Sequence, residues 1–200
     1  IIGAPIVIDV QPEIEYIVCE NGSVQITIQS STIDEYQWQS SPDGINWSDL
    51  IDNIYFSGVN SATLQIIDIP LSLDNFQFRA LVDRDGFGCI LYSESSTLLI
   101  NPVPETIIPT PLEECDDDYD GIVSYFDLET KTDEILNGQT GITVTYHETT
   151  TEAENNINGI TGLYTINSGD INNPDNQTLI VRLEDDIIVT EKEPLNCIAV

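Results

Sequence analysis

The feature that most restricts the fold of this chain is a repeated alternation of apolar and polar side chains. In the first half, Val24, Ile26 and Ile28 alternate with polar residues. The same period recurs over 36–39, 63–66, 76–83, 142–147 and 179–184. A period of two places one set of side chains on the buried face of a strand. Turn sequences that contain glycine separate these short runs, so we expect an all-β chain.

A proline-rich segment divides the chain into two modules. Its prolines are Pro102, Pro104, Pro109 and Pro111, and such a stretch is extended and pairs poorly with other strands. We expect an extended lead-in over 1–13, a β-sandwich over 14–101, a linker over 102–111 and a second sandwich-like module over 112–200. The second module is expected to be β-rich with short helices near 128–136 and 150–156. Cysteines on either side of a central tryptophan make the first module immunoglobulin-like.

The charge of the chain limits its partners. Asp and Glu number 35 against 5 Lys and Arg, which gives a net charge of -30. This excludes nucleic acid, whose binding depends on cationic side chains, and anionic membrane surfaces for the same reason. The sequence also contains no apolar run long enough for membrane insertion. We expect a fragment of a larger secreted protein that works outside the cell.

An acidic stretch at the start of the second module has the spacing of a calcium loop. Acidic side chains occupy loop positions 1, 3 and 5, and Gly121 occupies position 6, where a sharp turn is needed. The predicted Ca²⁺ ligands are Asp116, Asp118, Asp120, the carbonyl of Ile122, Ser124 and Asp127. The alternative is an acidic turn whose carboxylates accept hydrogen bonds from local amides.

The four cysteines fall as one pair in each half of the chain. Cys19 and Cys89 bracket the first module, and Cys115 and Cys197 bracket the second. In an oxidising compartment this distribution predicts one disulfide in each module. The alternative is four buried free thiols.

A further candidate site is an aromatic patch of Trp47, Tyr55 and Phe56, which could stack on a sugar. The alternative is that these rings cover the edge of a sheet. Trp38 is instead expected in the core of the sandwich. His147 is the only histidine, and the alternation places it opposite Tyr146, in solvent. With no nucleophile motif around any serine, the sequence predicts a protein that is not an enzyme.

Two segments resemble known repeats. The run YQWQSSPDGINWSDL at 36–50, followed by YFSG at 55–58, resembles the immunoglobulin-like modules of large secreted proteins of Bacteroidota. The segment CDDDYDG at 115–121, with the strands at 142–147 and 179–184, resembles a second, acidic repeat of the same proteins. The resemblance implies a gliding-type adhesin at the cell surface that is exported by the type IX secretion system. We expect neighbouring modules of the same chain as partners, together with a surface glycan or protein.

The sequence thus predicts a non-catalytic structural or adhesive segment, stiffened by calcium and disulfides. The alternative is a carbohydrate- or protein-binding accessory module of a secreted enzyme.

Overall fold

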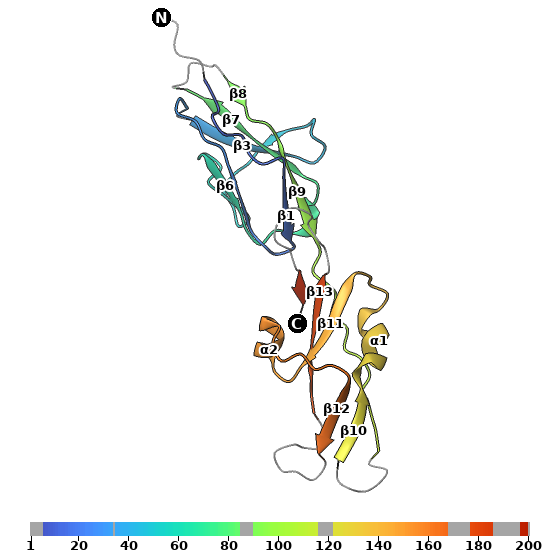
Figure 1. The fold of residues 1–200 in the computed structure, drawn as a ribbon. Coiled ribbons are helices and arrows are strands. Elements are labelled where there is room, and N and C mark those ends of the chain that lie inside the picture. The colour runs from blue at the N-terminus through green and yellow to red at the C-terminus, as the bar shows by residue number, and fades with distance from the viewer. Residues whose placement is uncertain are drawn as a thin grey trace, which may run out of the picture. The chain divides into compact units, whose positions relative to one another are not determined.

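The computed structural model describes residues 6–33, 35–84, 90–115, 122–167, 177–185 and 197–199. The chain forms two compact units, Ile1–Pro102 and Val103–Val200 (Figure 1). The boundary therefore falls after the first residue of the predicted linker.

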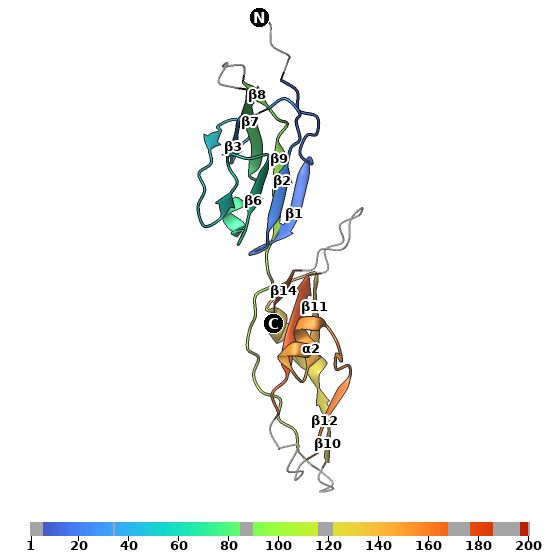
Figure 2. The ribbon, with the colours of Figure 1, turned by 90° about the vertical axis from the view of Figure 1, so that its left-hand side faces the viewer.

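The first unit contains two β-sheets. One has the order β1-β9-β7-β3-β4, with β8 paired to β7, and the other has the order β2-β6-β5. Strand β1 runs parallel to β9, and the other strand pairs are antiparallel. The elements are β1 (Glu15–Cys19), β2 (Val24–Thr27), β3 (Glu35–Ser41), β4 (Ser48–Asp49), β5 (Phe56–Ser57), β6 (Thr63–Ile66), the 3-10 helix η1 (Leu71–Leu73), β7 (Gln77–Asp83), β8 (Leu91–Tyr92) and β9 (Ser96–Asn101). Figures 1 and 2 show the two sheets face to face, as in an immunoglobulin-like sandwich.

The core of this unit follows the predicted alternation. Side chains from the two inner faces form one apolar cluster, and many of them are fully buried. They include Ile26, Ile28, Leu64 and Ile66 from one sheet region and Trp38, Phe78, Ala80 and Val82 from the other. Trp38 is 0% exposed, and its indole Nε1 donates a hydrogen bond to the carbonyl of Ser61 at 2.8 Å. The prediction of a core tryptophan is confirmed.

The second unit is β-rich with short helices, as predicted. A two-stranded sheet pairs β10 with β12, and a three-stranded sheet has the order β11-β13-β14. The elements are β10 (Ile122–Asp127), the 3-10 helix η2 (Leu128–Lys131), α1 (Thr132–Leu136), β11 (Ile142–His147), α2 (Thr150–Asn155), β12 (Leu163–Asn167), β13 (Ile180–Asp185) and β14 (Ile198–Ala199). Both predicted helical segments form. Thr149 and Glu152 start α2 with reciprocal side-chain-to-backbone hydrogen bonds, which satisfy amides that the helix leaves free.

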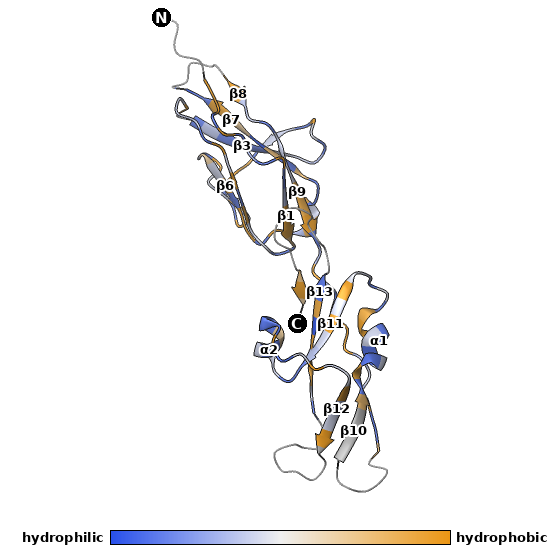
Figure 3. Ribbon diagram, in the orientation of Figure 1, coloured by the Kyte–Doolittle hydropathy of each residue, from blue (hydrophilic) through white to orange (hydrophobic). Residues whose placement is uncertain are grey.

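Helical segments cover both faces of the three-stranded sheet. On one face, Tyr146 and Leu183 share a core with Leu128 and Ile135. On the other, the buried Arg182 donates from Nη1 to the carbonyl of Ala153 in α2 at 3.1 Å. Figure 1 shows α1 and α2 on opposite sides of β11 and β13. Both helices are coloured mainly as hydrophilic in Figure 3, so they rely on a narrow apolar stripe for packing.

The proline-rich segment is part of the second unit. The backbone of Glu105 exchanges two hydrogen bonds with the side chain of Gln139, at 2.9 and 3.0 Å. Thr110 is held by Glu134, at 2.6 Å from its amide, and by Lys131, at 2.6 Å from its hydroxyl. Because side chains of the second unit supply the partners that a proline-rich strand lacks, this segment is a bound edge of that unit rather than a free linker.

None of the helices in the described part of the chain has the length and apolar character needed to cross a bilayer.

Candidate functional site

Cys19 lies at the end of the first unit from which the chain leaves. It is the last residue of β1 and pairs with Asn101, the last residue of β9. The amide of Glu20 then donates to the carbonyl of Asn101 at 2.8 Å. Since β1 and β9 run parallel, both strands end beside Pro102, where the unit ends. Cys19 is disulfide-bonded.

Cys197 occupies the matching place in the second unit. It is 1% exposed, and its carbonyl accepts a hydrogen bond from the amide of Asp185 at 3.0 Å. Asp185 ends β13 and pairs with Ile142, the first residue of β11. Gln139, which holds Glu105, lies just before Ile142 in the chain. Cys197 therefore lies at the end of the three-stranded sheet where β11 begins. It too is disulfide-bonded.

The pairing predicted for the second module is wrong. Cys115 is exposed and free, whereas Cys197 is buried and bonded. The physical reason is position: Cys115 follows the proline-rich segment at the surface, while Cys197 is packed against the end of β13. Cys89, the predicted partner of Cys19, lies outside the described residues.

The predicted calcium loop is only partly described. Asp116, Asp118 and Asp120 lie outside the described residues. Ile122 and Ser124 stand in β10, and Asp127 ends it, where its carboxylate caps η2 by accepting from the amide of Glu129 at 3.1 Å. Over the part of the chain that the structure describes, no three His, Cys, Asp or Glu residues gather closely enough to hold a metal.

Strand β10 separates two of the predicted ligands. At about 3.3 Å per residue, Ile122 and Asp127 are about 16 Å apart along an extended strand. Ligands of one calcium ion lie within about 2.6 Å of it. The strand therefore does not bring Asp127 beside Ile122, and Asp127 caps η2. The calcium loop as a whole stays a prediction, because Asp116, Asp118 and Asp120 lie outside the described residues.

His147 is buried, which corrects the expectation of a solvent-exposed side chain. It is 0% exposed. Its Nδ1 lies 2.9 Å from the carbonyl of Ile157, and its Nε2 lies 3.0 Å from the hydroxyl of Thr145. Because the face of β11 opposite Tyr146 is covered by α2 and the loop after it, alternation did not leave this side chain in water. The imidazole ties that loop to the sheet.

The predicted aromatic patch does not form as proposed. Phe56 is 9% exposed and belongs to the core, where its ring centroid lies 6.2 Å from that of Phe78. Tyr55 is half-buried against the same core. Trp47 faces elsewhere: the guanidinium carbon of Arg79 lies 4.1 Å from the centroid of its ring.

Sequence reasoning missed the two residues that accompany Trp47. Arg79 stands on β7 between buried Phe78 and Ala80, and Tyr92 stands on β8. The guanidinium carbon of Arg79 also lies 4.1 Å from the ring centroid of Tyr92. The available signal was that Arg79 falls on the polar side of its alternating strand, where it faces solvent.

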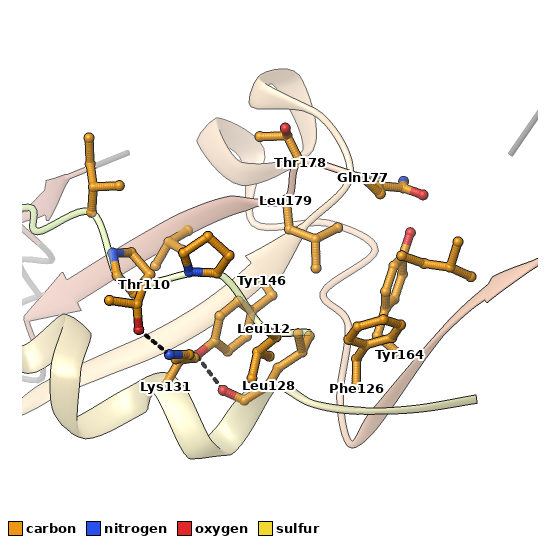
Figure 4. A pocket seen from close by; sticks show the side chains of 15 residues that line it. Thr110, Leu112, Phe126, Leu128, Lys131, Tyr146, Tyr164, Gln177, Thr178 and Leu179 are labelled. Carbon is orange, nitrogen blue, oxygen red and sulfur yellow. Dashed lines mark hydrogen bonds between the residues drawn. The ribbon is translucent and has the colours of Figure 1, made fainter. Parts of the chain in front are cut away.

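An apolar pocket of about 430 Å³ opens in the second unit between the proline-rich segment and the strands (Figure 4). Tyr146 closes its floor by donating from its hydroxyl to the carbonyl of Leu128 at 2.8 Å. Tyr164, on another wall, donates to Glu148 at 3.1 Å. Burial and the neighbouring Glu148 raise the pKa of Tyr164 to about 12, so this hydroxyl stays protonated. Among the described wall residues Lys131 is the ionised group, and it is paired with Glu134 at 3.0 Å.

Comparison with known proteins bears on both units. Residues 111–198 match a family described as the Flavobacterium inter-domain disulphide bond domain. Residues 13–102 match a family described as a domain of unknown function (DUF8696). No curated protein matches the chain. Among solved structures, titin M4 in its trigonal form is 18% identical, with a TM-score of 0.36, over 48% of this chain and 95% of that one.

These observations define a class of protein. The chain is an immunoglobulin-like sandwich joined to a β-rich unit, and it contains a disulfide. Disulfides of this kind persist outside reducing compartments. The matched families are structural or of unknown function by their descriptions.

Proposed function

We propose that this chain is a non-catalytic structural segment of a secreted, multi-domain surface protein of Bacteroidota. In this proposal a disulfide between Cys19 and Cys197 joins the second unit to the first. The observation that carries the proposal is that both cysteines are disulfide-bonded while Cys115 is free.

The number of cysteines restricts the pairing. The chain has four, and with Cys115 free only Cys19, Cys89 and Cys197 remain. If Cys19 paired with Cys89, Cys197 would have no partner within the chain. Pairing Cys19 with Cys197 satisfies both bonded residues. The description of the family that matches residues 111–198, an inter-domain disulphide bond domain, agrees with a bridge between units.

The place of each cysteine in its own unit also supports the bridge. Cys19 ends β1 beside Asn101, directly before the chain leaves the first unit. Cys197 lies beside Asp185 and the start of β11. The first residue of β11 comes three residues after Gln139, whose side chain holds Glu105. Both cysteines thus lie near the peptide connection. A disulfide there would add a second covalent link to the joint.

Such a joint suits a stalk. A single extended peptide between two units permits rotation, whereas two covalent links close together restrict it. A surface protein built from such segments holds its binding region away from the cell and transmits tension without bending at each joint. An adhesive role and export by the type IX system follow from the sequence resemblance alone.

Calcium remains a prediction for the segment 116–121. Its predicted ligands are Asp116, Asp118 and Asp120, with the carbonyl of Ile122, Ser124 and Asp127 completing the set. Bound calcium would relieve the repulsion between these carboxylates at the entry to β10.

The proposal is tested by cutting the chain close to the start of the second unit. A specific protease site is inserted at the exposed Thr106, and the cut protein is run on a denaturing gel without reductant. The two fragments are expected to migrate together and to separate when reductant is added. Cys115→Ala is the matched control and should behave like the parent, whereas Cys197→Ala should separate without reductant. Fragments of the parent that separate without reductant would refute the bridge.

A further inference from the structure

Arg79 is held between two aromatic rings on the outer face of the larger sheet of the first unit. Its guanidinium carbon lies 4.1 Å from the ring centroids of both Trp47 and Tyr92. Trp47 directly precedes β4, and Tyr92 stands on β8. In the sheet order, β4 lies beyond β3 on one side of β7, and β8 pairs with β7 on the other. The two rings therefore reach Arg79 from opposite sides.

The hydrogen bonds of Arg79 fix the orientation of the guanidinium. Its Nε donates to Oε1 of Gln39, directly opposite on β3, at 2.9 Å. Gln39 in turn donates from Nε2 to Asp49 at 2.8 Å. The carboxylate of Asp49 is thus hydrogen-bonded to the amide of Gln39 and not to Arg79.

Among the described acidic residues, none pairs with the fork of Arg79. Within the described residues the ion pairs are Lys131–Glu134 and Arg182–Glu184, and neither Nη of Arg79 donates to a described acceptor. This is notable in a chain with 35 acidic and 5 basic residues. Rings on both faces leave the edge that carries the Nη atoms as the direction open to a ligand.

The geometry points to a binding site for the carboxylate of one uronic acid residue of a surface polysaccharide. A guanidinium fork binds a carboxylate through two parallel hydrogen bonds. Aromatic rings offer apolar area to the C–H face of a sugar. Tyr92 is 44% exposed, so its ring is accessible beside the arginine.

The side-chain amide of Gln77 supplies a further hydrogen-bonding group. Gln77 lies two residues before Arg79 and on the same face of β7. Its amide lies next to Gly44, whose carbonyl accepts from the indole of Trp47 at 3.2 Å. An amide at this position can bond sugar hydroxyls, which an acidic peptide does not present. The combination of fork, rings and amide therefore favours an acidic sugar over an acidic peptide.

The test is an NMR titration of the ¹⁵N-labelled full chain with a galacturonate tetramer. The two tryptophans give two indole N–H signals: that of Trp47 reports the site and that of the buried Trp38 reports the fold. Addition of the tetramer should shift the Trp47 signal and leave the Trp38 signal in place. The methyl ester of the same tetramer, which lacks the charge, should bind at least tenfold more weakly.

Two variants of the arginine and one control locate the site. Arg79→Gln should weaken binding on the order of ten- to a hundredfold, because hydrogen bonds to a charged group are lost. Arg79→Lys keeps the charge between the rings but loses the fork, so it should weaken binding less. Lys131→Gln removes one positive charge from the second unit and should leave binding unchanged. If the Trp38 signal shows that Arg79→Gln is misfolded, the weakening of binding in Arg79→Lys tests the role of the guanidinium fork.

Four results would overturn the inference. They are absence of binding to the tetramer, equal binding of its methyl ester, loss in Lys131→Gln as large as in the Arg79 variants, and binding of a glutamate tetramer as tight as that of the sugar. The last would assign the surface to an acidic peptide.

Discussion

Loss of the proposed disulfide should destabilise both units by an amount that depends on the number of residues the disulfide encloses. We consider Cys19→Ala together with Cys197→Ala; alanine avoids placing an unpaired hydroxyl at the buried position 197. The two cysteines enclose about 180 residues, for which the loop-entropy relation gives about 5 kcal/mol. If the first unit unfolds alone, the free part of the ring is about 80 residues and the relation gives about 4.5 kcal/mol. These values are upper limits, because strain and residual structure reduce them.

Urea denaturation followed by two signals measures this effect. Both tryptophans lie in the first unit, so their fluorescence reports that unit, while far-UV circular dichroism reports both. The double variant should unfold at lower urea by both signals, and reductant should shift the parent protein to the same midpoints. Cys115→Ala, at an exposed free thiol, should change the unfolding free energy by less than about 0.5 kcal/mol. Unchanged midpoints in the double variant, or an equal loss in Cys115→Ala, would contradict the reasoning.

Three further predictions concern single features. Tyr146→Phe should destabilise the second unit by about 1–3 kcal/mol in urea denaturation, because the buried carbonyl of Leu128 loses its donor; an unchanged midpoint would mean that water replaces the hydroxyl. Hydrogen bonds from Asn46 and Ile45 hold the pKa of Asp43 well below its usual range. A depressed folded pKa adds stability above about pH 4, the unfolded value, and this is lost as pH falls below it. Asp43→Asn should therefore reduce the fall in urea midpoint between pH 5 and pH 3; an equal fall would exclude this role. Millimolar calcium should raise the melting temperature of the parent protein but not of Asp118→Ala/Asp120→Ala; a rise in both would place the ion elsewhere.

The alternation of side chains was sufficient to predict the first unit. Phe78, Ala80 and Val82 are fully buried on β7, as their period of two indicated, and Trp38 is the core tryptophan. In such a sandwich each strand has one buried and one open face, so the local pattern carries the fold.

The same rule failed where a strand is covered on both faces. His147 and Arg182 are buried beneath α2, which the alternation of β11 and β13 could not reveal. Their polar atoms are paired with backbone carbonyls and with Glu184. Polar residues can therefore occupy these interior positions, where the sequence pattern alone would place them in solvent. Burial there depends on the packing of a helix, and that is a tertiary property.

Candidate sites were harder to predict because they depend on pairs distant in sequence. Spacing suggested a bond between Cys115 and Cys197, but the end of β13 buries Cys197 and leaves Cys115 at the surface. Trp47 was identified as a candidate, yet its companions Arg79 and Tyr92 come from other strands. Only the sheet order brings them together.

The most direct test of the account is a disulfide map of the native chain. The protein is blocked with a thiol reagent, digested with pepsin at low pH to prevent exchange, and analysed by mass spectrometry without reduction. We predict one linked peptide pair that contains Cys19 and Cys197, with Cys115 carrying the blocking group. A linked pair of Cys19 with Cys89, or of Cys115 with Cys197, would contradict the disulfide-locked joint.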